Sequence, residues 1–220
     1  MKRRLKRMAT LVILGIALLF VVVVAGCVHF SGGTWMVKEA ALPEGWPQLT
    51  GVGDVQVKRY PVYRAAIVDD SQVAGGTGPM FNTLFSHIKR NDIAMTTPVE
   101  MGYERRVGPT PSMASMAFIY REPDWGTIGV DGNVLVRDVA SETMASIGVR
   151  GNYTDQRMRD NLAMLDAWLA DRTDRYRVTG PPRYLGYNGP FTPPFMRYGE
   201  VQVPVEELGS DTEPPAPDAD

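Results

Sequence analysis

Cysteine and histidine are scarce in this sequence. Its 220 residues include one cysteine, Cys27, and two histidines, His29 and His87. A single cysteine cannot form an internal disulfide or a thiolate metal cluster. Two histidines leave little material for a His-centred catalytic triad. The sequence therefore predicts neither a disulfide framework nor a metal site.

Catalytic motifs are also missing. The sequence contains no HExxH, no GxSxG and no Walker A motif, which are the short patterns that carry metal, nucleophile or phosphate chemistry. The acidic residues of its central part are scattered, with no obvious pair at catalytic spacing. We therefore predict a protein that is not an enzyme.

Little positive charge remains once the first seven residues, which hold five Lys or Arg, are set aside. The rest has 18 basic and 25 acidic residues. Residues 206–220 contain six of these acids and three prolines, a composition that cannot bury a core and predicts a disordered tail. Without the tail, 18 basic residues face 19 acidic ones, which predicts no nucleic-acid partner.

Residues 1–27 have the composition of a secretory signal. The basic cluster precedes an uncharged apolar run at residues 11–24, and the small residues Ala25 and Gly26 lie directly before Cys27. This ending resembles the bacterial lipobox, in which the cysteine is lipidated and becomes the new N-terminus. We therefore predict a lipoprotein signal with lipidation at Cys27.

An uncleaved signal anchor is the alternative, because residues 11–28, about 18 residues, are just long enough to cross the hydrocarbon core as a helix. In both cases the basic cluster stays in the cytoplasm and the bulk of the chain lies outside. Val28 is not the aspartate associated with inner-membrane retention, so the outer membrane is favoured if the host has one. We predict a cell-envelope protein that is anchored on the extracytoplasmic side.

The pattern between anchor and tail indicates one folded domain at residues 54–205, preceded by a linker and lead-in at residues 28–53. Trp35 and Trp46 of the lead-in are expected to pack back onto the domain. Residues 55–69 (VQVKRYPVYRAAIVD) predict a strand pair or one bent strand with a break at proline. A helix follows a Gly-rich turn, with one apolar stripe. The stripe consists of Phe81, Leu84, Phe85 and Ile88.

The second half repeats this order. Residues 133–151 have β-type composition, and Thr154 is placed to cap a long helix. Its predicted apolar stripe consists of Met158, Leu162, Leu165 and Leu169, widened by Met164 and Trp168. Residues 93–98 and 176–181 each follow a helix, lie 83 residues apart and place Thr and Pro at the same steps. Strand, helix and strand in each half predict a pseudo-twofold α+β domain, whose concave space between the halves is the expected ligand site.

Residues 91–99 (NDIAMTTPV) resemble the signature of the SOUL haem-binding protein family. Three further segments match the family in the right order. Residues 57–68 resemble its first core strand and residues 134–151 its mid-domain strand, while residues 183–190 with 199–201 resemble its closing segment. Together these segments cover nearly the whole predicted domain.

The resemblance implies a distorted antiparallel β-barrel or sheet, built from two similar halves and flanked by two helices. This type of fold is similar to bacterial effector-binding domains, which take up varied apolar or cationic molecules. The resemblance also implies a hydrophobic cleft for haem or another tetrapyrrole. The fold alone does not fix the ligand.

The resemblance places Arg59 and Arg64 at basic positions that contact haem propionates in one branch of the family. An arginine fork suits a carboxylate. The alternative is that both are solvated strand residues paired with acids. They share a face only if Pro61 creates a bulge. The histidine proposed as an iron ligand in another member is replaced by Arg59 here, which argues against axial histidine ligation.

Three further residues are candidates for ligand contact. Tyr60 lies in the matching strand, His87 lies one position off the stripe of the first helix, and Met95 has a thioether that can ligate haem iron. His87 is alternatively an ordinary flanking residue, and Met95 ordinary core filling.

The sequence thus predicts a membrane-anchored, non-catalytic binding protein for haem or another tetrapyrrole. Two alternatives stay open. The domain could bind a different hydrophobic or amphipathic small molecule, or it could be an interaction or structural protein whose cleft is filled by its own side chains.

Overall fold

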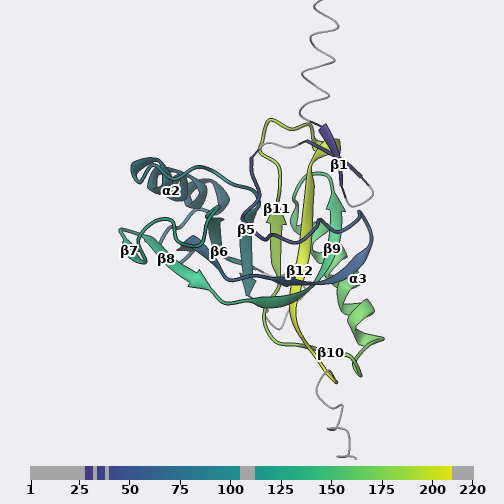
Figure 1. Ribbon diagram of the computed structural model, residues 1–220. Coiled ribbons are helices and arrows are strands. Elements are labelled where there is room, and N and C mark those ends of the chain that lie inside the picture. The colour runs from purple at the N-terminus through teal and green to yellow at the C-terminus, as the bar shows by residue number, and fades with distance from the viewer. Residues whose placement is uncertain (1–27, 32–33, 38–39, 105–111, 210–220) are drawn as a thin grey trace, which may run out of the picture.

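The computed structural model describes residues 28–31, 34–37, 40–104 and 112–209 (Figure 1). Cys27 and the apolar run at residues 11–24 lie outside this part, as does most of the acidic tail. The elements follow one another as β1 (Val28–Ser31), β2 (Thr34–Val37), β3 (Val55–Tyr60), β4 (Tyr63–Asp69), α2 (Thr77–Arg90), β5 (Val99–Glu104), β6 (Ser112–Ile119), β7 (Gly129–Asp131), β8 (Val134–Val139), β9 (Glu142–Arg150), α3 (Asp155–Ala170), β10 (Tyr176–Val178), β11 (Arg183–Gly186), the 3-10 helix η1 (Pro194–Met196) and β12 (Tyr198–Glu207). No helix in the described residues is long and apolar enough to span a membrane.

The predicted α+β fold with two helices is confirmed. Ten strands form one antiparallel sheet that stays open, with the order β3-β9-β12-β11-β5-β6-β4-β8-β7 and β10 paired to β12. The order from β3 to β8 is symmetric. Each strand of the first half has an equivalent in the second, β3 with β8, β4 with β9, β5 with β11 and β6 with β12, and equivalent strands lie at equal distances from the centre of the sheet. The pseudo-twofold axis therefore passes between β5 and β11. These two strands begin 84 residues apart, close to the offset of the sequence repeat.

The halves are joined by an exchange of strands. β3 pairs with β9 of the second half, and β8 pairs with β4 of the first. The chain breaks at Pro61, as the sequence indicates, and β3 and β4 then enter different parts of the sheet. Consequently β3 and β4 do not form a hairpin with each other.

Helix α2 buries a stripe that differs from the predicted one. Met80, Leu84, His87 and Ile88 are its buried residues, whereas Phe85 is exposed. Positions 80, 84, 87 and 88 follow helical spacing as well as the predicted stripe does. Leu84 and Ile88 of the predicted stripe are buried as expected, Phe81 is half-buried, and the place given to Phe85 was wrong. His87 was not expected in the stripe because its burial depends on hydrogen-bond partners that are distant in sequence.

Helix α3 begins at the predicted cap, where Thr154 Oγ1 accepts a hydrogen bond from the Arg157 N–H at 3.2 Å. Met158, Leu165 and Leu169 are buried as expected. Met164 is exposed, so its predicted place in the stripe was wrong. Met164 directly precedes the buried Leu165. Neighbouring residues of a helix differ by a rotation of about 100° around its axis, so Met164 points away from the sheet.

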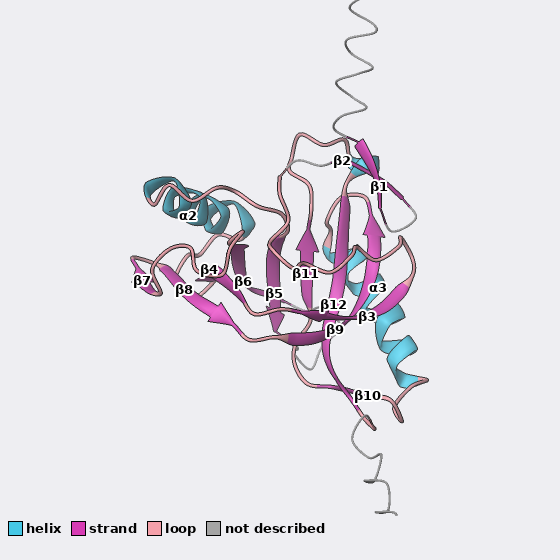
Figure 2. Cartoon of the chain, viewed as in Figure 1, coloured by secondary structure: helices cyan, strands magenta, loops and turns pink. Residues whose placement is uncertain are grey.

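The two faces of the sheet have different covers. The helices pack on one face, α2 against β4, β6 and β8 and α3 against β9 and β12. The lead-in at residues 40–54 crosses the other face as a loop (Figure 2). Trp46 packs edge-on against the Tyr60 ring at 4.7 Å between centroids, which confirms its predicted return to the domain. The side chain of Trp35 lies outside the described part.

The folded part begins before residue 54, the expected boundary. Leu49 and Thr50 of the lead-in are buried, and Val52 forms a parallel bridge with Gly148. A Cβ at position 148 would overlap the backbone of Gly51, so this close approach requires glycine. At the other end, β12 continues to Glu207, so the strand extends into the segment predicted as tail.

Candidate ligand-binding cleft

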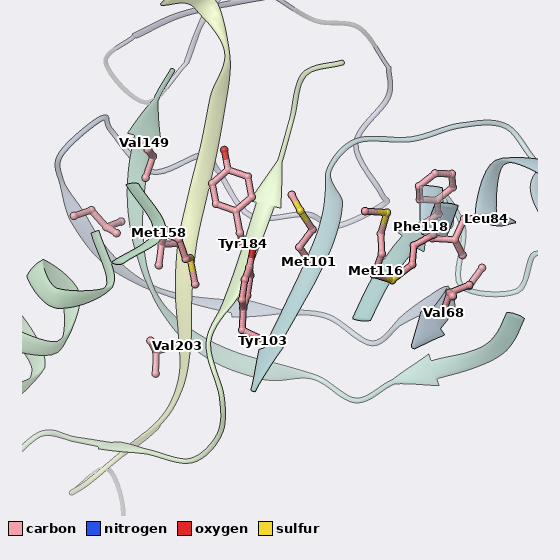
Figure 3. Packing of buried hydrophobic residues seen from close by; sticks show 14 of the residues in the cluster. Val68, Leu84, Met101, Tyr103, Met116, Phe118, Val149, Met158, Tyr184 and Val203 are labelled. Atoms are coloured by element: carbon pink, nitrogen blue, oxygen red, sulfur yellow. The ribbon is translucent and has the colours of Figure 1, made fainter. Parts of the chain in front are cut away.

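A cleft lies on the helix-covered face of the sheet, at the pseudo-twofold axis. Its floor follows from the strand register, because residues opposite each other in an antiparallel sheet share a face. One row across β12, β11, β5 and β6 consists of Val201, Tyr184, Met101 and Met116. Figure 3 shows Tyr184, Met101 and Met116 in succession across their strands.

The neighbouring row contains two glycines, of which Gly186 leaves open space in the floor. Gly186 lies between Gly199 and Val99 in the register. The position of a Cβ on Gly199 is already filled by the Tyr184 ring. A Cβ on Gly186 would be 3.5 Å from the Tyr184 ring and 4.0 Å from the Met101 methyl carbon, which are ordinary contacts. A side chain at position 186 would therefore enter the cleft without displacing the floor.

The walls come from both halves of the domain. The first turns of α2 form one wall, and Tyr153, just before α3, belongs to the other. The loop between β11 and β12 borders the opening. The cleft has a volume of about 800 Å³, within the range of small-molecule sites. It is lined by Ala40, Thr77, Gly78, Phe81, Asn82, Met95, Thr97, Val99, Met101, Met116, Gly151, Tyr153, Tyr184, Gly186, Asn188, Gly189, Pro190, Phe191, Arg197 and Tyr198.

Tyrosines supply hydroxyl groups to this apolar space. The rings of Tyr153 and Tyr184 lie 5.1 Å apart, and the Tyr103 hydroxyl donates to the Tyr153 hydroxyl at 2.5 Å. Burial raises the pKa of Tyr184 to about 12, although the charges of Arg157 and Arg197 act in the opposite direction. The phenol is therefore protonated at neutral pH and available as a hydrogen-bond donor.

Arg197 is the cation of the cleft lining. Its guanidinium donates to the carbonyl oxygens of Thr192 and Pro190 at 2.8 and 2.6 Å and to Asn152 Oδ1 at 2.7 Å. These bonds all go to neutral oxygens and involve three of its five N–H groups. Arg197 therefore holds its loop in place and still offers positive charge at the cleft.

Of the residues singled out in the sequence, Met95 lines the cleft. Arg59 is exposed on β3, and its Nε donates to Ser141 Oγ at 3.3 Å. Arg64 pairs with Asp138 at 2.8 Å and also donates to the carbonyls of residues 125 and 126. These arginines lie on different strands, away from the cleft lining. Arg64 is thus paired with a nearby acid, which is the alternative to a role in binding propionates.

Tyr60 and His87 are buried outside the cleft. His87 Nδ1 lies 2.6 Å from Asp131 Oδ2, and Nε2 lies 2.8 Å from the Tyr120 hydroxyl oxygen. The Arg90 guanidinium also donates to Asp131 at 3.1 Å. This cluster fastens the C-terminal end of α2 to β7. Within the described residues, no group of three or more His, Cys, Asp or Glu is placed to bind a metal ion.

The cluster around His87 predicts a pH dependence of stability. Hydrogen bonds from His87 and then Arg90 hold the pKa of Asp131 below its usual value of 3.8. A carboxylate with a lowered pKa in the folded state stabilises it above the unfolded pKa, and this contribution is lost as the pH falls through the folded value. Asp131→Asn should therefore flatten the fall in melting temperature below about pH 4.

The measurement is a series of thermal unfolding curves between pH 3 and pH 7. Asp124→Asn, which also removes an exposed carboxylate, controls for the change in net charge. An Asp131→Asn curve parallel to that of the wild type throughout the series would contradict this role.

A second polar cluster lies on the other face of the sheet, around Glu200. Glu200 is fully buried, and Lys58 Nζ lies 2.8 Å from its Oε1. The carboxylate also accepts hydrogen bonds from the Thr50 N–H, the Tyr198 hydroxyl and Gln202 Nε2, at 2.7, 2.8 and 2.7 Å. Burial lowers the pKa of Lys58, against the opposing attraction of Glu200. The cluster joins the lead-in to β3 and β12.

Residues 47–204 match the family model of the SOUL haem-binding proteins. The chain belongs to the SOUL family. The family is described as haem-binding. No curated protein matches this SOUL chain.

Solved structures share its fold at low identity. The C-terminal domain of EcmrR is 18% identical with a TM-score of 0.54, over 70% of this chain and 98% of that one. EcmrR in a DNA-bound complex is 20% identical with a TM-score of 0.54, over 70% and 58% of the two chains. A hydrolase from Listeria innocua is 13% identical with a TM-score of 0.47, over 70% and 93%. The two EcmrR likenesses concern the fold alone.

The sequence missed Tyr153, Tyr184, Gly186 and Arg197 as cleft residues. The segment 183–190 was recognised as a family motif, but its alternation was not used. In β11 the side chains of Arg183 and Leu185 point to one face, and Tyr184 and position 186 to the other. This alternation was the available signal for Tyr184 and Gly186.

Proposed function

We propose that this SOUL protein is a membrane-anchored, non-catalytic binding protein that holds haem or another tetrapyrrole in the cleft between its two halves. The observation that carries the proposal is the cleft itself, a cavity of about 800 Å³ with aromatic and methionine side chains on its floor and walls. Such a cavity suits a large, flat, apolar ligand. The family to which the chain belongs supports the same class of ligand.

The residues present fit a tetrapyrrole in part. Tyr184 and Met101 would contact the macrocycle from the floor, with Phe81 and Tyr153 at its sides. Arg197 would pair with a carboxylate. Methionine sulfur can ligate haem iron, and Met95, Met101 and Met116 all line the cleft. The arrangement does not fit histidine ligation by His87, because both its ring nitrogens have partners outside the cleft.

A different amphipathic small molecule is the second candidate. The observation that favours it is that, among the described residues, Arg197 is the one Lys or Arg in the cleft lining. Haem has two carboxylates, of which Arg197 could pair with one. A flat apolar molecule with a single acidic group matches this charge better.

Titration of the full chain in lipid nanodiscs with hemin tests the proposal, with empty nanodiscs as the blank. We expect a saturable shift of the Soret band. Arg197→Gln should weaken binding about 10- to 150-fold, since hydrogen bonds to charged groups contribute about 1.5–3 kcal/mol. Arg64→Ala should leave the affinity unchanged, because Arg64 lies away from the cleft.

Arg197→Lys, which keeps the charge, should recover part of the affinity. A Soret shift that does not saturate would contradict tetrapyrrole binding. If hemin fails, native mass spectrometry of the chain purified from membranes reports the mass of whatever ligand is bound.

The anchor is part of the proposal. The apolar run at residues 11–24 and the lipobox-like end at Cys27 support attachment to a membrane on the extracytoplasmic side. Mass spectrometry of the mature N-terminus tests it. A lipid-modified Cys27 would support lipidation, and an intact Met1 with the whole apolar run would contradict it.

A further inference from the structure

Two phenylalanines on the loop between β11 and β12 are almost fully exposed. Phe191 is 98% exposed and Phe195 is 74% exposed. Large apolar side chains that stand together in water commonly mark a surface that meets a partner or a membrane. The loop (NGPFTPPFMR, residues 188–197) contains neither Asp nor Glu.

The loop lies at the end of the molecule where the chain leaves its anchor. η1, which carries Phe195, contacts β2. β1, the partner of β2, starts at Val28, one residue after Cys27. Figure 1 shows β1 and the loop that follows β11 at the same end of the sheet, with β10 and the end of β12 at the opposite end. A membrane that holds residues 1–27 would therefore face this loop.

Part of the loop's backbone is already hydrogen-bonded or lacks an N–H group, which lowers the cost of entering a poorly hydrated environment. Three of its ten residues are prolines, which have no N–H group. The carbonyl oxygens of Gly189, Pro193 and Pro194 accept bonds from N–H groups within the loop. Arg197 satisfies those of Pro190 and Thr192, and Arg150 that of Met196.

The charge distribution agrees with contact to a lipid surface. Residues 28–38 (VHFSGGTWMVK) contain no acid, like the loop, and Arg197 adds a positive charge at the loop's base. Glu206 and Glu207 lie at the end of β12, at the opposite end of the molecule (Figure 1). Aromatic side chains with nearby Lys or Arg are typical of segments in the membrane interface.

The loop is also continuous with the cleft. Gly189, Pro190 and Phe191 belong to the cleft lining. Insertion of Phe191 into the interface would thus bring the opening of the cleft to the level of the lipids. An apolar ligand could then pass between bilayer and cleft without crossing water.

We propose that residues 188–197 form a membrane-insertion loop, in which Phe191 and Phe195 enter the lipid interface and the cleft opens onto the bilayer. The inference rests on the membrane attachment in the proposed function. It adds a second contact with the membrane and a route for the ligand.

The test uses the full chain in vesicles of phosphatidylethanolamine and phosphatidylglycerol, with and without brominated acyl chains that quench nearby tryptophan. Phe191→Trp and Phe195→Trp each add one tryptophan. The matched control is Val130→Trp, at an exposed strand position at the far edge of the sheet. The emission added by each variant is obtained by subtracting the wild-type spectrum.

We expect brominated lipid to remove at least about half of the emission added at positions 191 and 195, because interfacial aromatic residues lie at the level of the headgroups and upper acyl chains. Emission added at position 130 should be unchanged. A chain that floats with the vesicles while all three variants resist quenching would overturn the insertion loop and leave the anchor intact. A chain that does not float would overturn both.

Discussion

Gly186→Leu is expected to lower the affinity for hemin by about 10- to 100-fold while the domain stays folded. Of the two floor glycines, Gly186 is the one at which an added Cβ would meet only ordinary contacts. Overpacking such a site costs about 1–3 kcal/mol, and each 1.4 kcal/mol is a factor of ten in affinity. The measurement is the hemin titration in nanodiscs, with a thermal unfolding curve for each variant.

Gly186→Ala is the graded control. Its Cβ would lie 3.8 Å from the Val99 carbonyl oxygen and would fill little of the cavity, so its affinity should stay close to that of the wild type. Val130→Leu controls for added apolar volume outside the cleft. Wild-type affinity in a folded Gly186→Leu chain would show that hemin binds elsewhere.

Lys58→Met is expected to destabilise the fold by about 3–5 kcal/mol, the usual cost of removing one partner of a buried ion pair. The methionine has a similar shape but leaves the Glu200 carboxylate without its cation in a site with no exposure to water. Urea unfolding followed by tryptophan fluorescence measures the change, because Trp46 packs beside this cluster.

The double variant Lys58→Met/Glu200→Gln should recover much of the lost stability, since it removes the unpaired charge. Lys89→Met, at an exposed lysine on α2, should change stability by less than about 0.5 kcal/mol. A loss below about 1 kcal/mol in Lys58→Met would contradict the importance of the pair.

Local periodicity predicted both helices and the β-type segments at residues 55–69 and 133–151, whereas β1, β2, β6 and β7 were not predicted. Thr154 as the cap of α3 and the break at Pro61 both follow from short-range chemistry. The exchange of β3 and β8 between the halves could not be predicted, because it depends on pairing between strands far apart in the sequence. The sequence of β3 has the same alternation of apolar and polar residues whichever strand it pairs with.

The candidate site was predicted less well than the fold. Position in a family motif pointed to Arg59 and Arg64, whereas the strands that carry them lie in other parts of the sheet. Arg197 could not be recognised because its role depends on a loop that returns to the cleft. His87 was set apart from the helix stripe, since the partners that allow a histidine to be buried, Asp131 and Tyr120, are distant in sequence.

The exchanged strands have a consequence for how the protein folds. Neither half contains all the strands that its own side of the sheet requires, so neither half can complete its core alone. The pairing of β3 with β9 must wait until most of the chain is available, and contacts of such long range slow folding. We therefore regard the domain as a single cooperative unit in which a fragment ending after β6 would expose an unpaired edge. In two copies of such a fragment, β3 of each would complete the sheet of the other by pairing with its β4.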